Sequence, residues 1–315
     1  MIDFALHRLK GKDCLTLTDF SSEEIKELVE LAAALKQKHQ TGEKNNTLQG
    51  KVLALLFDKA STRTRVSFAV GMVQLGGHFL ELSQKDLQYG RGESLADTAR
   101  TLSGYVDAIM IRTFDQQMVE ELAKYATIPV INGLTDLYHP CQTLADLLTL
   151  KEEKGDLSKQ KVTYLGDGNN VLHSLMHGAA AVGMHLAIST PSGYEPLPKV
   201  WEETEKIAEQ TGAKITFHYD PIEAVQEADA VYTDVWASMG QEEEKEKRKL
   251  DFKDYQVNEA LMKHAKPNAI FMHCLPAYRG LEVSAGIIDG PQSVVFSQAE
   301  NRLHAQKALL LALLQ

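Results

Sequence analysis

The chain has 315 residues, 44% of them apolar, which is enough to bury the cores of two domains. A formal net charge of -10 disfavours nucleic acid and other polyanions as partners. The late apolar run from Ala308 to Leu314 is too short to span a bilayer, and the amino terminus lacks the apolar core of a signal peptide. Cys14, Cys141 and Cys274 are few and widely spaced, as is typical of a reducing compartment. We therefore expect a cytoplasmic protein with no membrane partner.

Helices and strands are predicted in alternation along the chain. Ser21 and Glu24 form a capping box that opens the first helix. In the first half, the predicted helices cover 22–40, 62–75, 94–104, 115–126 and 141–153, and the predicted strands cover 51–57, 78–82, 106–112 and 128–131. In the second half, the predicted strands cover 161–165, 184–189, 214–218, 230–234 and 269–273, and the predicted helices cover 171–182, 198–211, a segment opened by Asp220 and Pro221, and 299–314.

This alternation predicts the fold class. Strands separated by helices of this length indicate βαβ units and a mostly parallel sheet. The charged, glycine-containing segment KEEKGDLSKQ, residues 151–160, separates two halves of similar pattern. We predict an α/β protein of two similar domains, each with a mostly parallel sheet flanked by helices.

The stretch 51–65 passes from an apolar strand through a polar turn into a helix. Its turn and helix start carry the hydroxyls of Ser61, Thr62 and Thr64 and the guanidinium groups of Arg63 and Arg65. The first backbone amides of a helix have no partner within it, and the helix dipole places partial positive charge there. One N-cap residue is enough to start a helix, so five such residues in a row favour a phosphate site.

Polar residues also follow other predicted strands, where ligands of open α/β sheets bind. These residues are Arg112, 139–142, 169–170, 234–240 and 273–276. A phosphate held by arginines and helix amides, beside a neutral histidine and an Asp–Cys pair, suggests transfer from a small acyl phosphate to an amine. The charge run 242–249 is predicted to be either a solvated surface or a mobile lid.

Cofactor sites are disfavoured. The turn GDGNN, residues 166–170, lacks the third glycine of a dinucleotide fingerprint, and the next strand is not followed by the acidic residue that holds a ribose. His139 with Cys141 and His273 with Cys274 do not have the spacing of structural zinc ligands. A glycine-rich phosphate loop ending in GK is also missing. We expect no metal, nucleotide or other cofactor.

With these residues assembled, the sequence resembles the aspartate/ornithine carbamoyltransferase family over essentially the whole chain. Four motifs occur in the family's order: FDKASTRTR at 57–65, HPCQ at 139–142, DVWASMG at 234–240 and HCLP at 273–276. The third is similar to the family's ornithine-specific DxxxSMG pattern. Tyr278 and Leu281 depart from the pattern of bacterial relatives, and we expect them to alter surface or lid packing while activity is retained.

The resemblance implies transfer of the carbamoyl group of carbamoyl phosphate to the δ-amine of L-ornithine, giving L-citrulline and phosphate. It places the protein in arginine biosynthesis or in the catabolic direction, as a homotrimer or a multiple of trimers. It implies a carbamoyl-phosphate-binding domain at 1–150, with the C-terminal helix 299–315 packing back on it, and an ornithine-binding domain at 151–298. Putrescine or aspartate as the acceptor, or a non-catalytic protein that binds a phosphometabolite, are the alternatives.

The resemblance also implies roles for individual residues. Catalysis would rest on Arg112, His139, Asp234 and Cys274. Ornithine would be bound by Asn170, Asp234, Ser238 and Met239. Carbamoyl phosphate would be bound by Ser61, Thr62, Arg63, Thr64, Arg112, His139, Gln142, Cys274, Leu275 and Arg302, and by Gln88, which would reach a neighbouring subunit's site.

Overall fold

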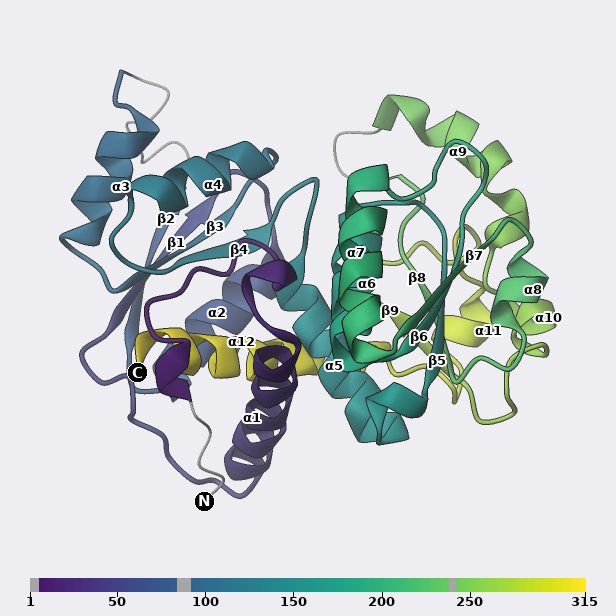
Figure 1. Cartoon of the computed structure of the whole chain (residues 1–315), viewed down its shortest axis with the longest axis horizontal. Helices are drawn as coiled ribbons and strands as arrows, with labels where there is room; N and C mark the ends of the chain where they lie inside the picture. Colours follow the sequence, from purple (N-terminus) through teal and green to yellow (C-terminus); the bar gives the residue numbers. More distant parts are fainter. Residues whose placement is uncertain (1–5, 84–91, 238–241) are drawn as a thin grey trace. The chain divides into compact units, whose positions relative to one another are not determined.

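The chain folds into two compact units in the computed structural model, which describes residues 6–83, 92–237 and 242–315 (Figure 1). The first unit contains Met1–Leu148 and Asn301–Gln315, and the second contains Thr149–Glu300. The end of the chain therefore returns to the first unit. Across the described ranges, every helix is too short or too polar to cross a membrane.

The first unit is built on a four-stranded parallel sheet. Its strands are β1 (Val52–Phe57), β2 (His78–Ser83), β3 (Ala108–Arg112) and β4 (Val130–Leu134), in the order β2-β1-β3-β4. Its helices are α1 (Ser22–Gln40), α2 (Thr62–Gln74), α3 (Leu95–Ser103), α4 (Gln116–Tyr125), the start of α5 (Pro140–Lys154) and most of α12 (Val295–Leu314). Short 3-10 helices cover Leu6–Arg8 and Leu17–Asp19.

The apolar run of β1 explains why helices cover both faces of this sheet. Residues 53–56 are fully buried, as expected for a central parallel strand. Ala54 and Leu56 face one way and join a core cluster with residues of α3 and α4. Leu53 and Leu55 face the other way because side chains alternate along a strand. Figure 1 shows α2 and α12 on that second side.

The second unit is built on a five-stranded parallel sheet. Its strands are β5 (Lys161–Leu165), β6 (His185–Ser189), β7 (Lys214–His218), β8 (Ala230–Thr233) and β9 (Ile270–His273), in the order β7-β6-β5-β8-β9. Its helices are α6 (Asn170–Val182), α7 (Pro198–Thr211), α8 (Pro221–Val225), α9 (Lys245–Asp251), α10 (Glu259–Met262) and α11 (Ala285–Ile288), with 3-10 helices at Leu157–Lys159, Glu242–Glu244 and Lys253–Tyr255. One core cluster joins Leu165, Val231 and Phe271 to residues of α8, α10 and α11.

Each sheet has a topological switch point, where successive strands are added on opposite sides. The switch lies between β1 and β3 in the first unit and between β5 and β8 in the second. In open parallel sheets, ligands bind in the crevice outside the carboxyl ends of the strands at such a point. The predicted residues that follow β1 and β3, and those that follow β5 and β8, therefore lie where a ligand site is expected.

Three local predictions differ from the structure. Strands β3 and β4 each begin two residues later than predicted, and α12 begins at Val295 instead of residue 299. The whole charge run 242–249 belongs to a 3-10 helix and α9. Arg248 in this run is only 6% exposed, so the predicted solvated surface is wrong at that residue. Its guanidinium group can be buried because it forms ion pairs with the carboxylates of Asp167 and Glu244.

Candidate active site

The turn after β1 is held in place from both ends. The Ser61 hydroxyl caps α2 and accepts a hydrogen bond from the Thr64 backbone N–H at 3.1 Å. The Asp58 N–H donates to the Arg112 carbonyl at 3.0 Å, which ties the turn to the end of β3. Lys59 is buried, and its ammonium group lies 2.5 Å from the Asp136 carboxylate. These contacts fix the first backbone amides of α2 at the switch point.

Thr64 is the meeting point of three segments that are distant in sequence. Its hydroxyl is fully buried and accepts a hydrogen bond from Arg302 of α12 at 2.7 Å. Arg112, the last residue of β3, donates to the same oxygen at 3.4 Å. The structure thus gathers the predicted residues Thr64, Arg112 and Arg302. We call Ser61, Thr64, Arg112, His139, Gln142 and Arg302 the first half-site.

His139 is buried among cations. Burial lowers the pKa of this imidazole well below its usual value, and the charges of Arg302, Arg112 and Arg63 lower the pKa further. The ring is therefore neutral at pH 7. A neutral imidazole keeps one N–H donor, which suits polarisation of a carbonyl oxygen without adding a fourth cation to the half-site.

Gln142 presents a buried acceptor. Its side-chain Nε2 donates to the Asp146 carboxylate at 2.8 Å, which fixes the orientation of the amide. Within the described parts of the chain, the buried Oε1 of Gln142 meets no hydrogen-bond donor. A buried polar atom without a partner is costly and needs an explanation. An N–H donor of a bound ligand would satisfy it.

Arg65 lies away from this group. Its guanidinium group is exposed, forms an ion pair with Glu81 of β2 at 3.2 Å and covers the Phe57 ring. The turn therefore supplies one guanidinium group to the neighbourhood of His139, from Arg63, and not the two that its sequence predicts. Thr62 is exposed at the first position of α2.

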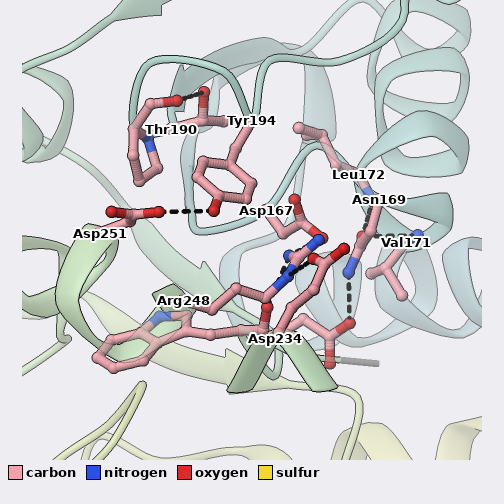
Figure 2. Close-up of polar contacts among 12 residues, drawn as sticks. Asp167, Asn169, Val171, Leu172, Thr190, Tyr194, Asp234, Arg248 and Asp251 are labelled. Atoms are coloured by element: carbon pink, nitrogen blue, oxygen red, sulfur yellow. Dashed lines mark hydrogen bonds and ion pairs between the residues drawn. The ribbon is translucent and has the colours of Figure 1, made fainter. Parts of the chain in front are cut away.

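Three strand ends meet in the second unit. Asp234 follows β8 and is buried. One of its carboxylate oxygens accepts from the Asn169 side chain, after β5, at 2.8 Å (Figure 2), and the other accepts from the Cys274 thiol, after β9, at 3.1 Å. We call Asn169, Asp234 and Cys274 the second half-site. It places the Asp234 carboxylate beside a thiol at the switch point. A buried carboxylate is a suitable partner for a cationic amine.

The segment after β9 is shaped by His273. Its Nδ1 accepts a hydrogen bond from the Leu275 N–H at 2.9 Å, so the ring proton lies on Nε2, which faces the buried Glu282 carboxylate at 3.3 Å. Ligand atoms of Asp234, His273 and Cys274 lie within 4.8 Å of one another, close enough to suggest a metal. However, both ring nitrogens take part in hydrogen bonds. The geometry is that of a hydrogen-bonded turn, and we assign no metal to it.

Leu275 adopts a left-handed backbone conformation with φ of 58°. A residue with a Cβ pays a conformational cost there, and such residues gather at functional sites. The resemblance places Leu275 and Cys274 among the carbamoyl-phosphate ligands, and both lie in the second unit, while the remaining described candidates for that substrate lie in the first. Gln88, Ser238 and Met239 are outside the described residues.

Asn169 and Asn170 were both predicted among the polar residues after the strands, and the resemblance gave a substrate role to Asn170. Asn169 caps α6 by accepting from the Val171 and Leu172 N–H groups, and its Nδ2 holds Asp234. Asn170 is the first residue of α6 and is half-buried. An asparagine directly before a helix is a preferred N-cap. Asp167 and Arg248, which lie next to this half-site, were missed.

Comparison with known proteins gives a consistent result for both units. Residues 12–152 match the model of the aspartate/ornithine carbamoyltransferase carbamoyl-P binding domain, and residues 158–313 match that of the Asp/Orn binding domain. The chain is 61% identical to an ornithine carbamoyltransferase of Oceanobacillus iheyensis over 99% of this chain and 97% of the relative. It is 60% identical to that of Bacillus subtilis over 97% of this chain and 95% of the relative.

Solved structures agree with these matches. The ornithine carbamoyltransferase structure from Pyrococcus furiosus superposes with a TM-score of 0.95 at 55% identity, covering 97% of this chain and 98% of the other. That from Thermus thermophilus superposes with a TM-score of 0.86 at 44% identity, covering 96% and 99%. Two family models, relatives of matching length and the same fold lead to one conclusion. The chain belongs to the aspartate/ornithine carbamoyltransferase family.

Proposed function

We propose that the protein transfers the carbamoyl group of carbamoyl phosphate to the δ-amine of L-ornithine, giving L-citrulline and phosphate. The observation that carries this proposal is the buried Asp234 carboxylate, held by Asn169 and Cys274 at the switch point of the second sheet. An anion in that place favours a cationic acceptor. The relatives compared above carry the name of this activity.

The first unit acts as the carbamoyl-phosphate-binding domain. Ser61, Thr62, Arg63 and Thr64 hold the phosphate through hydroxyls, a guanidinium group and the amides at the start of α2. The Gln142 Oε1, which lacks a donor in the described structure, accepts from the carbamoyl NH2 group. Gln88 adds a contact from a neighbouring subunit.

Arg112, His139 and Arg302 stabilise the carbamoyl oxygen. As the amine attacks the carbamoyl carbon, negative charge develops on that oxygen. Donors already in place require no reorganisation, and removing one such donor typically costs about 3 to 4 kcal/mol of transition-state stabilisation. The buried position of these three side chains strengthens the effect, because little water screens them.

The second unit acts as the ornithine-binding domain, with Asn170, Asp234, Ser238 and Met239 as its ligands. The δ-amine is protonated near neutral pH and must lose a proton before its lone pair can attack. Asp234 pairs with the ammonium group, and the carboxylate–thiol pair of Asp234 and Cys274 receives the proton. The C–N bond then forms and the C–O bond to phosphate breaks. The leaving phosphate takes the second proton of the attacking nitrogen and departs as a dianion held by the arginines.

The family includes enzymes for two acceptors, so the acceptor is the point to test. Aspartate would bring a second carboxylate toward buried Asp234, which like-charge repulsion disfavours. Putrescine has no carboxylate for Asn170 to hold. The purified protein should form citrulline from carbamoyl phosphate and ornithine far faster than it carbamoylates aspartate or putrescine. A folded protein that makes no citrulline would refute the proposal.

The protein acts in the cytoplasm as a homotrimer or a multiple of trimers, in arginine metabolism. Support for assembly comes from an exposed apolar surface on the first unit. Val66, Val70 and Val73 recur at helical spacing on α2 and are 52%, 36% and 59% exposed, and Leu80 on the edge strand β2 is 52% exposed. Clustered exposed apolar side chains mark interfaces. Light scattering after size exclusion would give the subunit number.

A further inference from the structure

Arg248 is a buried arginine with contacts to three separate parts of the second unit. Its Nη1 donates to the Asp167 carboxylate at 2.9 Å and to the Trp236 carbonyl at 2.8 Å, and its Nε donates to the Glu244 carboxylate at 2.8 Å. Figure 2 shows Arg248 reaching from α9 toward Asp167. Arginine is rarely buried unless its charge is paired, so the burial of Arg248 on the seven-residue helix α9 depends on these contacts.

The three partners lie at the edges of the second half-site. Asp167 belongs to the turn after β5, two residues before Asn169. Trp236 lies two residues after Asp234, at the start of the connection that leads to α9. Glu244 lies at the end of that connection. One guanidinium group therefore ties together both ends of the 236–244 connection and the turn that carries Asn169.

Hydrogen bonds connect Asp167 to Asp234 through Asn169. The Asn169 N–H donates to the Asp167 carbonyl at 2.8 Å, and the Asn169 side chain then donates to Asp234. Gly168 packs so closely that an added Cβ would lie 2.5 Å from the Glu195 backbone. The 167–169 turn is therefore tightly packed, and a shift of Asp167 should move Asn169 with it.

Aromatic packing holds the arginine from the other side. The Tyr194 ring covers the guanidinium group at 4.9 Å, and the Tyr194 hydroxyl donates to Asp251 of α9 at 2.7 Å (Figure 2). The Tyr194 carbonyl accepts from the Gly168 N–H at 2.8 Å. Trp236 and Phe252 stack at 5.9 Å. A planar guanidinium group satisfies this forked set of acceptors and the ring together, which an ammonium group cannot do.

We propose that Arg248 is a positioning residue for the acceptor substrate: it holds the Asp167 turn and the Trp236 backbone in register, so that Asn169 and Asp234 are preset to bind the amino acid. This inference rests on the proposed function, since it assigns Arg248 to the acceptor half of that reaction. Arg248 does not touch the reacting atoms. The competing interpretation is an ion pair that only stabilises the fold.

The test compares Arg248→Gln and Arg248→Lys with the control Lys249→Met on the same helix, whose ammonium group pairs with exposed Glu246. Arg248→Gln should raise the KM for ornithine by about tenfold to a hundredfold, the size of one charged hydrogen bond. The Kd for carbamoyl phosphate, measured by calorimetry, should stay within about twofold because its main ligands lie in the other unit. Arg248→Lys should recover part of the loss, and Lys249→Met should match the parent protein.

A second readout needs no activity. Asn169 caps the Val171 and Leu172 amides, so hydrogen exchange at these amides should be faster in Arg248→Gln and Asp167→Asn than in Lys249→Met. Unchanged ornithine KM in an active protein, or equal exchange in all variants, would overturn the positioning role. Failure of the parent protein to make citrulline would refute the proposed function instead, and exchange would still decide whether Arg248 holds the turn.

Discussion

Replacing Asp234 by asparagine changes one atom in the second half-site and removes its negative charge. The parent carboxylate accepts from both Asn169 and Cys274, at 2.8 and 3.1 Å. An asparagine has one acceptor oxygen, so its NH2 group must face one of these two donors. The variant therefore loses a hydrogen bond within the half-site as well as the partner of the substrate ammonium group.

The size of the effect follows from the burial of Asp234. Two unit charges about 4 Å apart interact by roughly 4 kcal/mol at an effective dielectric constant of about 20. Since each 1.36 kcal/mol is about a tenfold change in rate, kcat/KM for ornithine should fall by about a thousandfold. Carbamoyl phosphate binding should change little, because the first half-site lies in the other unit.

Asp229→Asn is a matched control at the other end of strand β8. Asp229 precedes β8 as Asp234 follows it, and it is also buried. Its carboxylate accepts from Lys266 at 2.8 and 2.9 Å and from the Lys161 N–H at 2.9 Å. The Asp229→Asn substitution should lower the free energy of unfolding and leave kcat/KM for ornithine within about twofold of the parent value. Steady-state rates of citrulline formation give kcat/KM for ornithine in both variants. A loss below tenfold in Asp234→Asn, or equal losses in the two variants, would refute the assigned role.

Three further outcomes are expected. Cys274→Ala should lower kcat at least about tenfold while the Kd for carbamoyl phosphate changes far less, and equal losses in both would argue against the carboxylate–thiol pair as proton acceptor. Burial lowers the pKa of His177 from 6.5 to about 4, so below pH 6.5 the unfolded chain binds the extra proton and the free energy of unfolding falls, by about 2 kcal/mol between pH 6.5 and 5. Urea titrations should show that His177→Asn removes this part of the slope and that exposed His264→Asn keeps it. Val70→Lys should lower the mass of the proposed trimer in light scattering, and an unchanged mass would exclude the α2 face as the interface.

The strands and the phosphate turn were predictable because their signals are local. The run VLALLF is typical of a strand covered on both faces of a parallel sheet, and Ser61 caps α2 as its position indicates. The early start predicted for β3 was wrong for a local reason too. Val106 is apolar and buried, but its N–H donates to the Leu102 carbonyl at the end of α3, so its burial does not indicate a strand.

Arg248 could not be predicted, because its environment depends on long-range contacts. In sequence it is one charge in a run of charges, which normally indicates a solvated helix. Its partner Asp167 lies 81 residues earlier, and nothing in the local pattern of either residue announces the pair. The folded chain brings them together only when β5 and β8 become neighbours, so the contact is a consequence of the topology.

The two half-sites have opposite electrostatics, and the proposed reaction makes use of the difference. In the first, burial and then the charges of Arg302, Arg112 and Arg63 lower the pKa of His139 and keep it neutral, because protonation would add a fourth cation. A bound phosphate would offset those charges and remove part of the force that lowers the pKa of His139. The imidazole would then be easier to protonate as the carbamoyl oxygen gains charge, and an imidazolium is the stronger hydrogen-bond donor. In the second, we expect the Asp234 carboxylate to stabilise the ammonium form of the acceptor, and the Cys274 thiol lies 3.1 Å from that carboxylate. In the proposed reaction, the pair that binds the acceptor also takes its proton.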